Sequence, residues 1–206
     1  MSVPARENPF AVHRLERLAY RFDSGAGWEE LLRRLKTLRL RAAIVGPQGS
    51  GKTTLLKELL HRLEDEGLRS ACLTLRSDDA RPASAVWRFL RARSRAEILA
   101  IDGAERLSAP AWRLLRGVSH LFRGLIATTH APGRLPSLHE CRTRPALLQE
   151  LVAELSPAAD MTPQIAAALF ADHRGNIRDA LLACYLQIAR APAGGGAPAA
   201  LPPLRT

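Results

Sequence analysis

One short segment, Gly46-Pro-Gln-Gly-Ser-Gly-Lys-Thr53, constrains the fold more than any other part of the chain. The residues before it, 41–45, end in four apolar side chains and predict a short buried strand. The residues after it, 52–66, carry leucines at helical spacing, with Gly67 as a stop. A strand that leads through a glycine-rich turn into a helix opens a βαβ unit, and such units build parallel sheets.

The same segment matches the pattern GxxxxGK[ST] at every fixed position. Its glycines let the loop turn tightly, so that backbone N–H groups and the positive end of the following helix face one point and can bind phosphate. Lys52 is expected to reach the β- and γ-phosphates, and Thr53 to offer its hydroxyl to Mg²⁺. A glycine-rich turn without a ligand would show the same letters, but the flanking strand and helix favour a phosphate site. The predicted nucleotide-binding residues of this segment are Gly46, Pro47, Gln48, Gly49, Ser50, Gly51, Lys52, Thr53 and Thr54.

The rest of the chain alternates apolar strands with amphipathic helices up to about residue 143 and is helical afterwards. Further strands are expected at 70–75, 97–102, 124–129 and 138–141, and helices at 8–21, 28–38, 83–93 and from 108 onward. This alternation predicts an α/β fold with a mostly parallel five-stranded sheet and helices on both faces. We expect four segments: an N-terminal helical segment 1–40, a core 41–143, a small helical lid 144–190, and a disordered Pro/Gly/Ala tail 191–206.

A second motif supplies the acid that a magnesium-dependent phosphate site needs. Ile98-Leu-Ala-Ile-Asp102 is a hydrophobic strand that ends in a carboxylate, and Asp102 is expected to hold Mg²⁺ together with Thr53. Asp102 therefore joins the predicted nucleotide-binding residues. The alternative is a strand-terminating aspartate that only caps the next turn.

Together these segments resemble the additional-strand P-loop ATPases and, within them, the AAA+ group, over residues 8–190. Asn8-Pro-Phe10, followed by Tyr20, is similar to the start of ExeA-type and TniB-type members, in which this segment packs beside the adenine. A plain docking helix explains these residues equally well. The resemblance implies a three-layer P-loop NTPase core with a C-terminal lid, bound ATP and Mg²⁺, and hydrolysis of ATP to ADP and phosphate.

The resemblance also implies catalytic roles for Lys52, Glu105, Thr129 and Arg178. The superfamily usually has a glutamate directly after the strand-end aspartate, but this chain has Gly103 there, so Glu105 is the candidate base and slow hydrolysis is expected. A glutamate introduced at Gly103 is then expected to speed the reaction. The strand 124–129 resembles the sensor 1 strand, which lies between the strands that carry the phosphate loop and Asp102.

Two segments carry the sensor candidates. At the end of the strand 124–129, Thr129 is the first choice, with Thr128 and His130 as alternatives. His173-Arg-Gly-Asn-Ile-Arg-Asp-Ala180 resembles the sensor 2 motif, in which Arg178 would meet the triphosphate. Asn176 and Asp179 are spaced as a capping box for the helix that follows. An ordinary helix–helix turn with a solvated arginine is the alternative.

The composition bears on partners and location. The formal net charge is +10, and only three of the 30 basic residues are lysines, as a GC-rich genome would produce. DNA or RNA binding through Arg88, Arg91, Arg93 and Arg95 is the competing explanation. Three widely spaced cysteines favour buried thiols in a reducing compartment. With no run of about 18 apolar residues and no apolar segment at the N-terminus, we expect a cytoplasmic protein without a membrane span.

Three readings of function stay open at this point. The first is an ATPase that couples its nucleotide state to a protein or nucleic-acid partner. The second is a P-loop kinase, and the third is a nucleotide-binding switch with little hydrolysis. An arginine finger, from a neighbouring subunit of a homo-oligomer, would complete the resemblance to the AAA+ group, and the sequence does not choose among the candidates Arg113, Arg116, Arg123, Arg142 and Arg144.

Overall fold

The computed structural model describes residues 6–23 and 27–190, so the predicted tail 191–206 lies outside the described residues. Contacts divide the chain into two compact units. One unit comprises Met1–Leu18, Gln48–Ser50 and Arg142–Thr206, and the other comprises Ala19–Pro47 and Gly51–Cys141. Each unit has a hydrophobic core of its own.

The larger unit is built on a five-stranded sheet with the strand order β2-β3-β4-β1-β5. All its pairings are parallel, which confirms the α/β class and the largely parallel sheet. The strand β4 lies between β1 and β3, the position that the resemblance to a sensor 1 strand implies for the segment 124–129. The strands are β1 (Arg41–Val45), β2 (Ser70–Thr74), β3 (Ile98–Asp102), β4 (Gly124–Thr129) and β5 (Ser137–Glu140).

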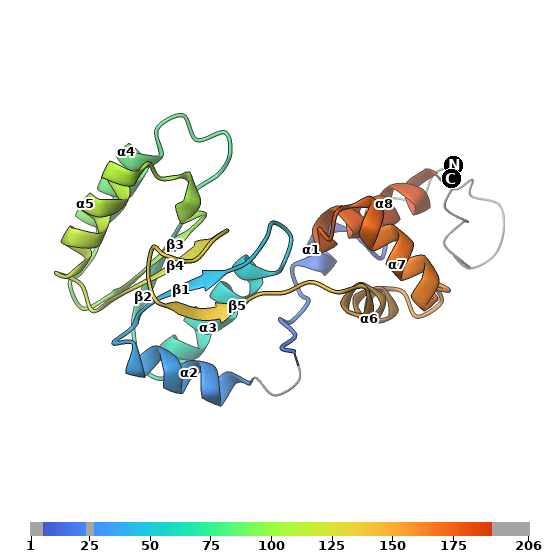
Figure 1. Cartoon of the computed structure of the whole chain (residues 1–206), viewed down its shortest axis with the longest axis horizontal. Coiled ribbons are helices and arrows are strands. Elements are labelled where there is room, and N and C mark those ends of the chain that lie inside the picture. Colours follow the sequence, from blue (N-terminus) through green and yellow to red (C-terminus); the bar gives the residue numbers. More distant parts are fainter. Residues whose placement is uncertain (1–5, 24–26, 191–206) are drawn as a thin grey trace. The chain divides into compact units, whose positions relative to one another are not determined.

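Helices cover both faces of this sheet (Figure 1). The helices α2 (Trp28–Thr37) and α3 (Lys52–Asp65) pack on one face, and α4 (Pro82–Arg91) and α5 (Ala109–Ser119) pack on the other. The side chains of β3 alternate between the hydrophobic cores on the two faces of the sheet. Ile98 and Ala100 face α2 and α3, whereas Leu99 and Ile101 face α4 and α5. Burial on both faces explains why the strands are almost purely apolar, and the arrangement is compatible with the expected three-layer fold.

The smaller unit is helical. It contains α1 (Val12–Leu15), α6 (Pro145–Leu155), α7 (Pro163–Asp172) and α8 (Ile177–Arg190). Phe10 is buried in its core, and the Asn8 amide donates a 2.9 Å hydrogen bond to the carbonyl of Tyr185. The segment 8–10 therefore belongs with the C-terminal helices.

The N-terminal region differs from the sequence-based description in two ways. The expected helix 8–21 is reduced to α1, because no helix continues beyond Leu15 and the N–H of Tyr20 donates to the carboxylate of Glu58 instead of to a helix carbonyl. Residues 1–40 were grouped as one segment, whereas the contacts divide them between Leu18 and Ala19.

Among the described residues, no helix combines the length and the apolar character required to span a membrane.

Candidate functional site

The glycine-rich loop follows β1 and leads directly into α3. Gly49 and Gly51 have φ values of +75° and +83°, in the left-handed region that favours glycine, so this turn depends on its glycines. Gly51 is the N-cap of α3 and offers no side chain to the first N–H groups of the helix. Those donors stay available to an anion, as they do at helix N-termini that bind phosphate.

Lys52, the first residue of α3, is held inside this loop. Its side-chain ammonium donates hydrogen bonds of 2.7 Å to the carbonyls of Gly46 and Pro47, and the residue is only 8% exposed. Burial lowers the pKa of the Lys52 ammonium, and the neighbouring charge of Glu105 opposes that shift. The loop thus holds the Lys52 ammonium at the point where a phosphate would bind.

The predicted metal ligands Thr53 and Asp102 lie side by side. The Thr53 hydroxyl donates to Asp102 Oδ2 at 2.9 Å, and the Thr128 hydroxyl donates to Asp102 Oδ1 at 2.8 Å. These hard oxygen donors fit Mg²⁺, which in nucleotide sites takes one or two protein ligands and completes its shell with phosphate oxygens and water. The described residues contain no group of three or more His, Cys, Asp or Glu side chains that could hold a metal without such help.

The two threonines at the end of β4 have different partners. Thr128 also accepts a 2.8 Å hydrogen bond from the N–H of Gly103, so it joins the end of β3 to Asp102. Thr129 is equally buried, but its hydroxyl donates to the carbonyl of Ala131. The sequence-based prediction preferred Thr129. Alternation shows that neighbouring side chains point to opposite faces of the sheet, but it does not show which of the two faces the site. The structure instead brings Thr128 into the network around Asp102.

Glu105 lies on the short 3₁₀ helix η1 (Ala104–Arg106), directly after β3. Its Oε1 lies 3.2 Å from Nε2 of His130, the residue after β4. Its Oε2 is buried and has no hydrogen-bond partner among the described residues. The charge of Glu105 also opposes the burial-induced lowering of the pKa values of Lys52 and Arg134. The carboxylate therefore lies among cations and has one acceptor oxygen to spare.

Gly103 makes the turn that presents Glu105. It has φ +83°, and a Cβ at this position would lie 2.7 Å from the carbonyl oxygen of Leu75. No side chain fits there without a shift of the backbone. The expectation that a glutamate at this position would speed hydrolysis consequently meets a steric obstacle that the sequence did not reveal.

Arg134 is a site residue that the sequence analysis missed. It lies in the turn-rich stretch after β4, and its guanidinium donates 2.7 Å hydrogen bonds to the carbonyls of Ala104 and Leu107. The same guanidinium lies over the ring of Trp112, 5.1 Å from its centroid. Arg134 thus holds η1 from both sides of Glu105. One more arginine in an arginine-rich chain gave no signal for this role.

The tip of the loop, Gln48–Ser50, groups with the helical unit. A Cβ at Gly49 would lie 1.8 Å from Asn176 Oδ1 and 3.3 Å from the backbone nitrogen of Arg178. Only a glycine permits this approach. The side chain of Arg178 is exposed and has no hydrogen bond or ion pair within the described ranges.

The predicted capping box of α8 forms in a modified way. The N–H of Asp179 donates to Asn176 Oδ1 at 3.2 Å, as expected for a cap. In return, Asp179 accepts from the side-chain amide of Asn176, because the backbone N–H of Asn176 donates to the carbonyl of His173. The helix that carries Arg178 therefore has a well-defined start.

An aromatic cluster lies beside the loop in the larger unit. The Tyr20 ring would be 3.3 Å from a Cβ at Gly51, and its hydroxyl shares a 2.8 Å hydrogen bond with Nε2 of His139. Burial raises the pKa of Tyr20 and lowers that of His139, so both groups stay neutral near pH 7. Burial likewise raises the pKa of the Cys141 thiol to about 11, which argues against a reactive thiolate.

Comparison of the chain with protein-family models and with curated proteins gave no match. Function is therefore inferred from the residues and contacts above.

Proposed function

We propose that the chain is a Mg²⁺-dependent P-loop ATPase with an AAA+-like core, which converts ATP to ADP and phosphate. The supporting observation is the assembly at the carboxyl ends of β1, β3 and β4, where open α/β sheets bind their ligands. The phosphate loop, the Thr53–Asp102 pair and the buried, unpartnered oxygen of Glu105 all belong to this end of the sheet. ATP state would be coupled to a protein or nucleic-acid partner.

The loop supplies binding of the triphosphate. In the proposal, Lys52 exchanges its two carbonyl partners for the β- and γ-phosphate oxygens, and the first N–H groups of α3 complete the cradle. The positive φ values of Gly49 and Gly51 give the loop the tight turn that this binding requires. The Tyr20 ring lies beside Gly51 of the loop, and we propose that it packs beside the adenine, as the resemblance implies.

Thr53 and Asp102 would hold the magnesium ion, which when bound neutralises charge that develops on the phosphate oxygens. Thr128 keeps Asp102 oriented through a 2.8 Å hydrogen bond. Because Asp102 is engaged in this way, the acceptor for the proton of the attacking water is Glu105. Arg178 is proposed to respond to the γ-phosphate, as the resemblance to the sensor 2 motif implies.

Hydrolysis is expected to be slow, below the roughly 1–100 s⁻¹ of kinases. Glu105 comes from η1 and not from the position directly after Asp102, and one of its oxygens lies against His130. This pairing also favours the second candidate function, a nucleotide switch that hydrolyses little. Phosphate release by the wild type distinguishes the two.

The test is thermal melting of the wild type with Mg-ATP and Mg-ADP, together with steady-state phosphate release. Ligand at about 100 times its Kd should stabilise the fold by about 2.7 kcal/mol. Lys52→Ala should lose most of this stabilisation, whereas Lys57→Ala, an exposed lysine on the same helix, should keep it. A wild type that shows no melting shift with millimolar Mg-ATP would overturn the proposal.

A further inference from the structure

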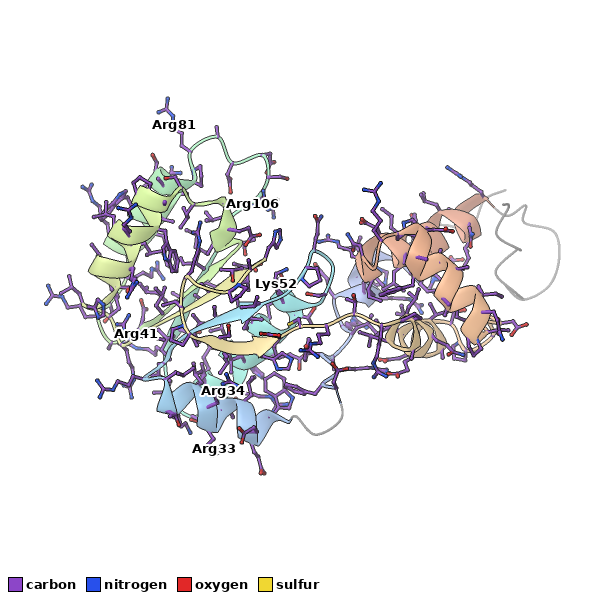
Figure 2. All side chains as sticks on the ribbon, in the orientation of Figure 1. Arg33, Arg34, Arg41, Lys52, Arg81 and Arg106 are labelled. Carbon is purple, nitrogen blue, oxygen red and sulfur yellow. The ribbon has the colours of Figure 1, made fainter. Side chains whose placement is uncertain are left out.

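The amino ends of the strands form a second edge of the sheet, opposite to the candidate site. All strands of a parallel sheet begin at the same edge. Arg41 opens β1, Arg69 directly precedes β2, and Arg123 directly precedes β4. Figure 2 labels Arg41 at this end of β1 and Lys52 beyond the other end. Arginines therefore mark one end of the sheet, as the phosphate loop marks the other.

Backbone hydrogen bonds show that these strand starts adjoin. The N–H of Ile98 donates to the carbonyl of Arg69 at 2.9 Å, and the N–H of Arg123 donates to the carbonyl of Glu97 at 3.2 Å. Neighbouring strands lie about 4.8 Å apart, so the edge from β2 through β3 and β4 to β1 spans about 14 Å.

Five exposed arginines define what we call the arginine edge. Three of them lie at the starts of strands or just before them, one precedes β3 by three residues, and one is in the last turn of α5. Within the part of the chain that the structure describes, their guanidinium groups have no hydrogen bond and no ion pair. They are Arg39, Arg69, Arg95, Arg116 and Arg123.

Two polar side chains near this edge, Arg41 and Glu97, are already engaged. The half-buried Arg41 donates to the carbonyls of Ser119 and Phe122 and so fixes the end of α5 at this edge. The carboxylate of Glu97 accepts the N–H of Ser94. The backbone at this edge is thus held in place by hydrogen bonds, whereas the guanidinium groups of the arginine edge remain available to a ligand.

The helices above it show the same asymmetry. Together α4 and α5 carry four arginines and no acid, whereas α2 and α3 carry five acids beside six lysines and arginines. Both layers come from one genome, so codon composition does not explain why acidic residues balance the basic ones in the α2–α3 layer but not in the α4–α5 layer. The last turns of α4 and α5 also lie toward the amino end of the sheet, because crossover helices run opposite to the strands.

We propose that the arginine edge binds the phosphate backbone of duplex DNA. Guanidinium groups bind phosphates bidentately, and a duplex presents one charge per about 1.7 Å of its axis. An edge of about 14 Å matches roughly four phosphates of one strand. Proteins that bind single strands stack bases on aromatic rings, whereas Phe122, the aromatic neighbour of Arg123, packs against the core. The proposal goes beyond the ATPase assignment and does not depend on it.

The experiment measures binding of a labelled short DNA duplex to the full chain by fluorescence anisotropy, over a series of salt concentrations. The wild type should lose affinity steeply with salt, by about 0.9 in log–log slope per phosphate contact. The variant Arg69→Gln/Arg95→Gln/Arg123→Gln should bind at least tenfold more weakly and lose about 2.7 from the slope. Melting curves check that it folds.

The matched control is Arg33→Gln/Lys57→Gln/Arg62→Gln, which removes the same charge from the α2–α3 layer. It should keep at least half of the wild-type affinity. Equal losses in both triple variants would show that net charge alone binds DNA and would overturn the assignment. So would an absence of wild-type binding at low salt, or equal or tighter binding of single-stranded DNA or polyglutamate.

Lys52→Ala separates this proposal from the ATPase. It should bind the duplex like the wild type even when nucleotide no longer stabilises it. Loss of duplex binding in this variant would place the DNA contact at the phosphate loop instead and would overturn the proposal.

Discussion

The two ends of one sheet use their charged residues in opposite ways. At the carboxyl end, Lys52, Asp102 and Arg134 are tied to loop carbonyls or hydroxyl groups by hydrogen bonds of 2.7 to 2.9 Å. At the amino end, exposed arginines such as Arg69 and Arg123 have no such partners in the described part of the chain. Preorganised charge suits the recognition of one small ligand, whereas free charge suits a long polyanion.

The largest expected effect compares the two glutamates that flank β3. Glu105→Gln should reduce phosphate release by about 10²–10⁴-fold, because a carboxamide does not accept a proton from water. Nucleotide-induced stabilisation should persist. Glu97→Gln, at the other end of the strand, should hydrolyse at the wild-type rate. If Glu105→Gln turns over like the wild type, Glu105 is not the base.

The second comparison is between a bonded arginine and a free one. Arg134→Met removes two hydrogen bonds to the carbonyls that flank Glu105, which should cost about 2 kcal/mol and lower Tm by roughly 4–8 °C. Arg123→Met should leave Tm within about 1 °C. Arg134→Lys should restore part of the stability and of the phosphate release. Equal melting of the two methionine variants would contradict the role of Arg134.

A third comparison uses two glycines of the same unit. Gly103→Ala should destabilise the protein by about 1–3 kcal/mol, since its φ is positive and Leu75 blocks the Cβ. Gly117→Ala, in α5 with no atom within 4 Å of the added carbon, should be neutral or stabilise by up to about 1 kcal/mol. Gly103→Glu should share the defect of Gly103→Ala and lower phosphate release. Denaturant unfolding measures all three variants, and a stable Gly103→Ala would contradict the geometry.

The smallest expected effect is on pH dependence. Burial lowers the pKa of His139 below its unfolded value of 6.5, so between these two values the unfolded chain binds more protons. The contribution of His139 is fully present above pH 6.5 and is lost as pH falls toward the folded pKa. In His139→Gln, the decrease in Tm between pH 7 and pH 5 should be smaller than in the wild type by about 1–3 °C. An unchanged slope would exclude His139 as its source.

Local sequence patterns predicted much of the carboxyl end of the sheet. The apolar strands and the glycine loop follow from short-range rules, and the structure confirms the parallel sheet. The place of β4 between β1 and β3 is the one that the resemblance to a sensor 1 strand implied. Lys52, Thr53 and Asp102 could be chosen because parallel strands bring their ends together. That these residues bind a nucleotide remains a prediction.

Only the tertiary structure decided the finer placements. Whether Thr128 or Thr129 faces Asp102 depends on how β4 registers against its neighbours, and a shift of one residue reverses every side chain. Arg134 acquires its role from a loop that folds back on η1, about 30 residues earlier in the chain. The arginine edge has the same origin. Its members are scattered through the sequence and become neighbours because parallel strands all start at one edge, which no local pattern encodes.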